Sequence, residues 1–393
     1  MSNVTTSTTI RYHGLDALRA FAMITGIILH AALLYTDDDL AYEITGKKGT
    51  PTSDTLGMVF FFIHTWRMPV FFLLAGFFTR LMVQRRGLVN LLKNRSIRIG
   101  IPLIIGSLTY NLLLGFGTIT QLHHLWFLYD LVWMYLILCF IKYLGIAPKW
   151  FWIIIWWPLA FPAINRRIST LFRKYTSDNI TQTFDSIFSS YGNLWYLMIF
   201  LIPATTVGRP LFINWINTDI GIPGPFFITG FSYFLVGWFM HRNTEILSIL
   251  SNNYKKNLIL AAGSFFVFIT VLGLANGNKE TEEGGLYHLI GLVLSPITTF
   301  LLVIAFIGIA DLLFQRSNTI ITYFVDASYW IYLFHLVAVF AIGSAIITEV
   351  QPIVGVSINI IFTTVICICT YHIFARYTPI GWTLHGKKWV KKG

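Results

Sequence analysis

Three ionisable residues stand inside a membrane-length apolar stretch near the start of the chain. Residues 15–35 read LDALRAFAMITGIILHAALLY and contain Asp16, Arg19 and His30. A helix turns by ~100° and rises ~1.5 Å per residue, so Arg19 and His30 share nearly one face and lie about 16 Å apart along the axis. Asp16 joins the same stripe. Because ionisable groups are costly at bilayer depth, we expect this stripe to face protein or water.

Later apolar segments contain similar groups. FFFIHTWRMPVFF places a histidine and an arginine within one turn, LHHLWFLYD opens with a histidine pair, and DASYWIYLFHL carries Tyr332 on roughly the same side as its histidine. Counted inward from the outer ends, five side chains are expected to meet as a polar cavity in the outer half of the bilayer: His30, Arg67, His124, Trp126 and His335.

Each candidate has a structural alternative. A single intramembrane histidine is more often an interhelical hydrogen-bonding residue than a catalyst, which we apply to His64, His123 and His288. Asp16 has the alternative role of bringing Arg19 to the membrane edge as an ion pair. Trp126 and Tyr329 have the alternative role of interface aromatics. Glycines such as Gly76 and Gly100 are expected to permit close helix packing rather than to bind phosphate.

The composition is that of a polytopic membrane protein. Of 393 residues, 55% are hydrophobic and 11% charged, with a mean hydropathy of +0.67. The three cysteines lie in apolar runs and indicate neither a disulfide framework nor a metal site. The net charge of +11 comes from basic residues between and after apolar segments, which indicates membrane topology rather than nucleic-acid binding. Motifs of P-loop, zincin, CxxC and GxSxG proteins are absent from the sequence.

Ten segments have the length needed to cross a bilayer, about 20 apolar residues each. We therefore predict an all-α, polytopic integral membrane helix bundle that forms a single domain over residues 1–393. The segments are 15–35, 58–80, 99–118, 123–144, 193–212, 225–241, 257–275, 286–313, 320–348 and 354–375.

Loop charges predict the orientation. The connector after the second segment is rich in arginine, whereas the one after the first is acidic, so the positive-inside rule places both termini in the cytoplasm. The basic tail, 376–393, is then cytoplasmic and the acidic stretch 276–285 is an outer loop. Residues 149–165 are apolar but short, Trp-rich and interrupted by two prolines, so we predict an interfacial or re-entrant element there.

Four of these stretches together resemble a known family. LDALRAFAMITGIILH, WRMPVFFLLAGFF, HLWFL and YWIYLFH, in this order, are similar to the membrane-bound acyltransferase-3 family, over residues 11 to 376. Within it the chain most resembles the branch that adds succinyl groups to osmoregulated periplasmic glucans. The resemblance implies transfer of an acyl group from cytoplasmic acyl-CoA, succinyl-CoA or acetyl-CoA, to a sugar hydroxyl beyond the bacterial inner membrane, with no permanently bound cofactor.

The resemblance also assigns residues. The family's arginine and histidine pair maps onto Arg19 and His30, its second-span arginine onto Arg67 and its later histidine onto His335. Two positions depart from the family. Ala75 stands where many relatives have serine, which excludes a serine nucleophile there, and His335 is followed by leucine rather than histidine or proline.

Acyl transfer to an alcohol requires a base for the hydroxyl and hydrogen-bond donors for the oxyanion. We expect His30 to be the base and Arg67 the carbonyl donor, with Arg19 and Asp16 holding the acyl-CoA. The acceptor side would be lined by a second group: His335, Tyr332, His124 and Trp126. The arginines at positions 95 and 98 could attract CoA phosphates, although a topology signal is the stronger interpretation. Direct transfer and an acyl-histidine relay both remain open.

Two other classes of protein are compatible with a polar stripe in a membrane helix. A secondary transporter of sugars or acylated sugars could use the stripe as a proton relay, but it predicts inverted repeats, which the sequence does not show. A membrane sensor or scaffold would not need aligned arginine and histidine residues on several spans. The oligomeric state is left open by the sequence.

Overall fold

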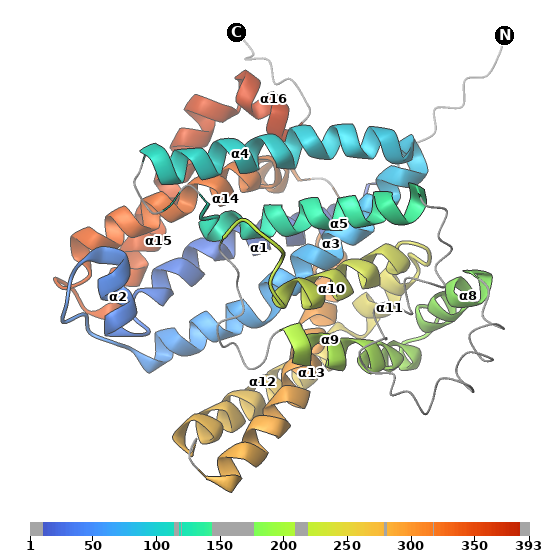
Figure 1. Ribbon diagram of the computed structural model, residues 1–393, viewed down its shortest axis with the longest axis horizontal. Helices are drawn as coiled ribbons and strands as arrows, with labels where there is room; N and C mark the ends of the chain where they lie inside the picture. Colours follow the sequence, from blue (N-terminus) through green and yellow to red (C-terminus); the bar gives the residue numbers. More distant parts are fainter. Residues whose placement is uncertain are drawn as a thin grey trace.

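The computed structural model describes residues 11–113, 118, 120–143, 177–208, 219–278, 281–316 and 318–385. Every named element within these ranges is a helix, which confirms the predicted all-α class (Figure 1). The helices are α1 (His13–Leu33), α2 (Asp38–Thr45), α3 (Asp54–Arg95), α4 (Ile101–Leu108), α5 (Trp126–Tyr143), α8 (Ser177–Ile187), α9 (Met198–Gly208), α10 (Phe226–Met240), α11 (Ile246–Asn252), α12 (Tyr254–Gly277), α13 (Glu282–Leu313), α14 (Thr319–Ile346), α15 (Pro352–Thr370) and α16 (Pro379–His385).

Short helical turns complete the chain between these helices. A π-helical turn, η1 (Ser96–Gly100), joins α3 to α4, and a 3₁₀ turn, η3 (His123–Leu125), leads directly into α5. His123 in η3 has a φ of 47°, in the left-handed region that non-glycine residues rarely adopt. This backbone turn puts both histidine rings of the pair against the Tyr110 ring, with centroid distances of 5.8 and 5.0 Å.

The predicted spans correspond to the long apolar helices. Seven helical segments within the described ranges are long and apolar enough to cross a membrane, and two shorter apolar helices, Gly192–Gly208 and Phe226–Met240, lie on two further predicted spans. One of the seven, Asp54–Leu112, contains the whole of the second predicted span and residues 99–112 of the third. The chain is therefore a multi-pass membrane protein. The predicted element at 149–165 lies outside the described residues.

The connector predicted between the second and third spans is itself helical. Helix α3 continues to Arg95 and is interrupted at Gly87, where φ is 77°. This conformation suits glycine because a side chain would be strained there. The break divides a helical segment that would otherwise be far longer than the ~30 Å hydrocarbon layer, and it lets α4 cross the bundle in a new direction (Figure 1).

Helix α1 lies at the centre of the bundle. It packs against α3, α13, α14 and α15, and its buried face includes Leu15, Ala22 and Ile27. Figure 1 shows α4 and α5 crossing one side of this core, while α12 and α13 form a hairpin that extends beyond the other helices. The polar stripe of α1 is thus surrounded by protein helices, as its ionisable residues require.

Two glycines stand where the backbones of α3 and α10 approach each other too closely for a side chain. A Cβ at Gly76 of α3 would collide with the Phe234 carbonyl of α10, and a Cβ at Gly237 of α10 would collide with the Leu73 carbonyl of α3. The packing role predicted for Gly76 is therefore confirmed, and it has a reciprocal partner. The same prediction is wrong for Gly100, because a Cβ there would meet no atom within 4 Å.

Candidate active site

Three histidines from three different elements form a buried cluster. The His335 ring of α14 lies 5.2 Å from the His30 ring of α1 and 5.4 Å from the His124 ring of η3, measured between ring centroids. His335 is completely buried, and His124 is 8% exposed. The structure therefore brings together three of the residues that the sequence predicted to meet.

Backbone carbonyl groups fix the tautomers of two of these rings. His335 Nδ1 lies 2.8 Å from the Tyr332 carbonyl oxygen and 3.0 Å from that of Ile331, so Nδ1 donates and Nε2 of the neutral ring keeps its lone pair. His124 Nε2 lies 3.0 Å from the same Tyr332 oxygen and donates to it, which leaves the lone pair on Nδ1. Each ring therefore has one nitrogen that can accept a proton.

One ring nitrogen of each cluster histidine lacks a hydrogen-bond partner in the described part of the chain. His30 Nδ1, His124 Nδ1 and His335 Nε2 are buried, and none has a hydrogen-bond partner among the residues that the structure describes. Buried polar atoms are normally satisfied, so an unpaired set at one place indicates a position for a ligand or water. This is the property that an acid–base site requires.

The Arg67 guanidinium adjoins this cluster. Its Nε donates to the Ala22 carbonyl oxygen of α1 at 2.8 Å, and the side chain is 5% exposed. A Cβ at Gly26 of α1 would collide with the guanidinium and would lie 3.3 Å from His335 Nε2, so these two groups flank the same small surface of α1. Arg67 can therefore donate hydrogen bonds to an oxygen atom held beside the histidines.

Tyr332 and Trp126 occupy different positions relative to the cluster. The Tyr332 hydroxyl donates to the His124 carbonyl oxygen at 2.7 Å, and its ring lies 5.3 Å from the His124 ring. Tyr332 thus connects α14 to η3 at the cluster. Trp126 instead packs beside Phe72 and Phe226, with ring distances of 6.4 and 5.2 Å. The predicted role of Trp126 on the acceptor side stays a prediction.

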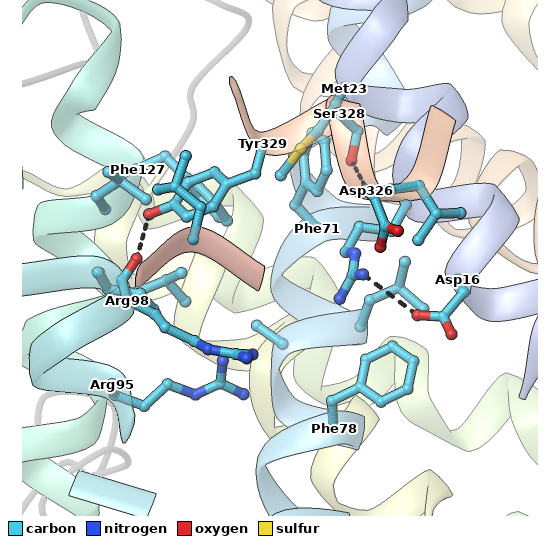
Figure 2. A pocket seen from close by; sticks show the side chains of 18 of the residues that line it. Asp16, Met23, Phe71, Phe78, Arg95, Arg98, Phe127, Asp326, Ser328 and Tyr329 are labelled. Carbon is cyan, nitrogen blue, oxygen red and sulfur yellow. Dashed lines mark hydrogen bonds and ion pairs between the residues drawn. The ribbon is translucent and has the colours of Figure 1, made fainter. Parts of the chain in front are cut away.

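A separate cavity of about 260 Å³ lies toward the other end of the same helices (Figure 2). Four arginines and two aspartates line it: Arg11, Arg19, Arg95, Arg98, Asp16 and Asp326. Figure 2 shows Arg95 and Arg98 reaching in from one side and Asp16 and Phe78 from the other. Its remaining lining is largely apolar and aromatic. The excess of guanidinium groups over carboxylates makes the cavity suitable for an anionic ligand with an apolar portion.

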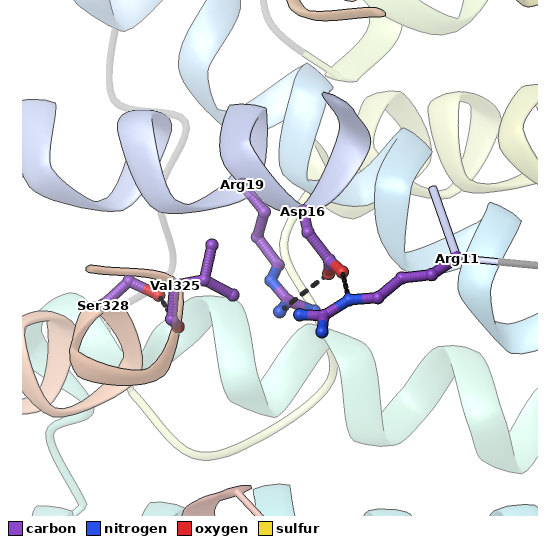
Figure 3. Close-up of polar contacts among 5 residues, drawn as sticks. All are labelled: Arg11, Asp16, Arg19, Val325 and Ser328. Atoms are coloured by element: carbon purple, nitrogen blue, oxygen red, sulfur yellow. Dashed lines mark hydrogen bonds and ion pairs between the residues drawn. The ribbon is translucent and has the colours of Figure 1, made fainter. Parts of the chain in front are cut away.

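Asp16 orients the arginines at one wall of this cavity (Figure 3). Its carboxylate lies 3.2 Å from Arg19 Nη2, one turn along α1, and 3.2 Å from Arg11 Nε. The Arg19 guanidinium also lies 5.7 Å from the centre of the Phe78 ring. The predicted pairing of Asp16 with Arg19 is confirmed, and both residues belong to the cavity rather than to the histidine cluster.

Some residues that line the cavity are not identified by the sequence patterns. They are two arginines, for which a topology signal is the simpler interpretation, and apolar residues such as Met23. Arg95 and Arg98 line the cavity together with Arg19, although a topology signal was the preferred interpretation. The Tyr329 hydroxyl donates to the Arg98 carbonyl oxygen at 2.5 Å, which fixes η1 against α14. The helical spacing of Met23, four residues after Arg19, was the available signal for the missed residues, but apolar residues at such spacings are common in any membrane helix.

A comparison with known families decides which of the candidate classes applies. The sequence profile described as "Acyltransferase domain" matches residues 12–372. The chain belongs to this membrane-bound acyltransferase-3 family. The protein is therefore an acyltransferase, and the transporter and scaffold alternatives are set aside.

Curated relatives agree along nearly the full length of the acyltransferase. It is 27% identical to proteins named "Glucans biosynthesis protein C" from Shigella dysenteriae serotype 1 and from Escherichia coli K12, over 97% of this chain and 96% of each relative. The predicted resemblance to that branch is thus confirmed. No solved structure matches the acyltransferase.

Proposed function

We propose that this acyltransferase moves a succinyl or acetyl group from cytoplasmic acyl-CoA to a hydroxyl group of a periplasmic glucan or another cell-envelope carbohydrate. One observation carries the proposal: the arginine-lined cavity and the histidine cluster lie in series along the same four helices, α1, α3, α5 and α14. The glucan acceptor is added from the names of the relatives. The protein would reside in the bacterial inner membrane with both termini in the cytoplasm.

The cavity is the proposed binding site for acyl-CoA. Phosphate groups pair well with guanidinium groups, which donate two parallel hydrogen bonds. Arg95 is suited to this role because its guanidinium lies 5.5 Å over the Tyr135 ring and its Nε has no hydrogen-bond partner within the described part of the chain. The apolar side chains that line the cavity, which include Leu74 and Leu128, would contact the pantetheine arm.

The histidine cluster is the proposed site of transfer. The acceptor hydroxyl oxygen attacks the thioester carbonyl carbon, and the carbon–sulfur bond breaks. His30, with His335 beside it, takes up the hydroxyl proton and returns it to the leaving thiolate, which yields free CoA. The Arg67 guanidinium donates hydrogen bonds to the carbonyl oxygen as negative charge develops on it. Tyr332, His124 and Trp126 would line the side from which the carbohydrate enters.

The succinyl group is the favoured acyl group because of the resemblance to the glucan-succinylating branch. Succinylation adds one negative charge to a neutral glucan, whereas acetylation adds none. Mass spectrometry of glucans from cells with and without the gene separates the two cases. Loss of succinyl esters supports this donor, and loss of acetyl esters alone would assign acetyl-CoA instead.

The activity itself is tested with purified protein, succinyl-CoA or acetyl-CoA, and glucan. Release of free CoA and an equal amount of acylated glucan are expected. Arg95→Gln should raise KM for acyl-CoA by about tenfold or more, because a charge-assisted hydrogen bond contributes ~1.5–3 kcal/mol. Arg316→Gln, an exposed arginine outside the cavity, is the matched control and should keep the wild-type KM. An unchanged KM in Arg95→Gln would contradict the assignment of the cavity.

A further inference from the structure

Four helices present the cavity and the cluster in the same order, with one layer of residues between them. In each helix, one residue that lines the cavity, one residue of the intervening layer and one residue of the cluster form a series. Neighbouring residues of a series are three, four or seven positions apart, so each series follows one face of its helix. The series are Arg19, Met23 and His30 in α1; Leu74, Phe71 and Arg67 in α3; Leu131, Phe127 and His124 in α5 and η3; and Ser328, Tyr332 and His335 in α14.

The middle layer closes the cavity on the side of the cluster. Met23, Phe71 and Phe127 are buried, and all three line the cavity at the end opposite Arg95 and Phe78 (Figure 2). The Phe71 and Phe127 rings lie 5.4 Å apart between centroids. We call these three side chains the apolar barrier.

The barrier is one side chain thick. The Arg67 guanidinium lies 5.6 Å from the centre of the Phe71 ring, and Phe71 also lines the cavity. The Phe127 ring lies 6.2 Å from the Tyr332 ring, which in turn contacts the cluster. Met23 directly follows Ala22, whose carbonyl oxygen accepts the hydrogen bond from Arg67. None of the three cluster histidines lines the cavity.

We infer that the apolar barrier separates bound acyl-CoA from the catalytic histidines until the acyl–pantetheine arm displaces it, and that Phe71 controls this passage. The inference rests on the proposed function of the two sites. In the closed arrangement the thioester stays in the cavity, away from both the base and the oxyanion donor. Displacement of the Phe71 ring joins the cavity to the cluster and places the carbonyl group beside Arg67.

Such a barrier prevents a competing reaction. Water that reaches the thioester beside a general base can attack the carbonyl carbon in place of the sugar hydroxyl. The carbon–sulfur bond then breaks, the water proton passes through the base to the thiolate, and the products are the free carboxylic acid and CoA. A barrier that opens for the arm limits this hydrolysis when no acceptor is bound. Met23 suits a movable layer because its side chain is unbranched and flexible.

Phe71→Ala tests the barrier by leaving a permanent opening between the cavity and the cluster. The measurement is free CoA released from acyl-CoA by purified protein with no glucan present. We expect a rise of roughly tenfold or more over wild type, because water and thioester now meet at the base. Phe62→Ala is the matched control. It removes the same side chain from the same helix, where it packs against Phe265 and Phe306, and should keep the wild-type rate.

Phe71→Leu provides a second variant that keeps an apolar side chain and should be intermediate in glucan-free CoA release. It also decides the question if Phe71→Ala does not fold. Folded variants with wild-type glucan-free hydrolysis would overturn the inference, whether or not they still acylate glucan. If the wild-type protein transferred no acyl group to any glucan and the variants released no CoA, the proposed function would be contradicted, and the barrier inference with it. If the wild-type protein acylated glucan but the Phe71 variants hydrolysed acyl-CoA no faster than the wild type, only the barrier inference would be contradicted.

Discussion

The cluster residues act through individual nitrogen atoms. The sequence predicted most of these side chains, but it did not predict the tautomers of the histidine rings. His30 and Arg67 were predicted from their positions in apolar helices, and the structure places both at the cluster. The tautomer of His335 depends on carbonyl groups of its own helix at 2.8 and 3.0 Å, which no sequence pattern reveals. The sequence did not favour a ligand-binding role for Arg95, because a helix end rich in arginine also follows from membrane topology.

His30→Gln tests the base. Glutamine keeps the approximate size and hydrogen bonding of histidine but does not accept a proton at neutral pH. Turnover per folded molecule should fall by about 10²–10⁴, the range for a lost general base. Monodispersity in detergent is the control for folding. If His30 only joined helices, the variant would lose folded protein while the folded fraction kept its specific activity.

Gly26→Ala tests the position of Arg67 without removing it. The new Cβ would collide with the guanidinium, which must then leave its present position beside Gly26. Turnover should fall by about 10²–10³, comparable to the loss of one oxyanion donor. Because alanine favours helix over glycine by about 1 kcal/mol, a large loss of stability is not expected. Gly263→Ala on α12, where a Cβ meets no atom within 4 Å, should retain activity. Full activity of Gly26→Ala would argue against the role of Arg67.

The helices hold the two sites in register, and close packing of α3 against α10 is one source of that register. The length of the apolar segments predicted where the spans lie, because such length is a strong signal in a bilayer. It did not predict that α3 continues to Arg95 or that Gly87 interrupts it, since a basic amphipathic connector looks much like a loop in sequence. The apolar barrier was equally hidden, because Met23 and Phe71 resemble residues that face lipid.

Gly76→Ala and Gly237→Ala test this packing. Each Cβ would overlap a backbone carbonyl of the facing helix, and backbone cannot yield as a side chain can. Each variant should lose about 1–3 kcal/mol of stability, as is usual for an overpacked core. Thermal unfolding in detergent measures the effect, with Gly263→Ala as a control that should be at least as stable as the wild type, because its Cβ meets no atom within 4 Å and alanine favours helix. Wild-type stability of both variants would mean that the two helices can separate at no cost.

At the scale of the whole molecule, the proposed transfer requires that the two sites open to opposite sides of the membrane. The predicted topology, with both termini in the cytoplasm, places the connector around Asn90 inside and Asn278 outside. Single cysteines at these positions, in a background lacking Cys139, Cys367 and Cys369, should be labelled by a membrane-impermeant thiol reagent from opposite sides. Labelling of both positions from the same side would contradict the predicted topology.

Transfer across a sealed membrane tests the proposed function most directly. The protein is reconstituted into vesicles with glucan enclosed and succinyl-CoA outside, and both compartments are then analysed by mass spectrometry. We predict acylated glucan inside the vesicles and an equal amount of free CoA outside, with neither product formed by His30→Gln. Acylation only when glucan and acyl-CoA share a compartment, or export of unmodified glucan, would contradict transfer through the bundle.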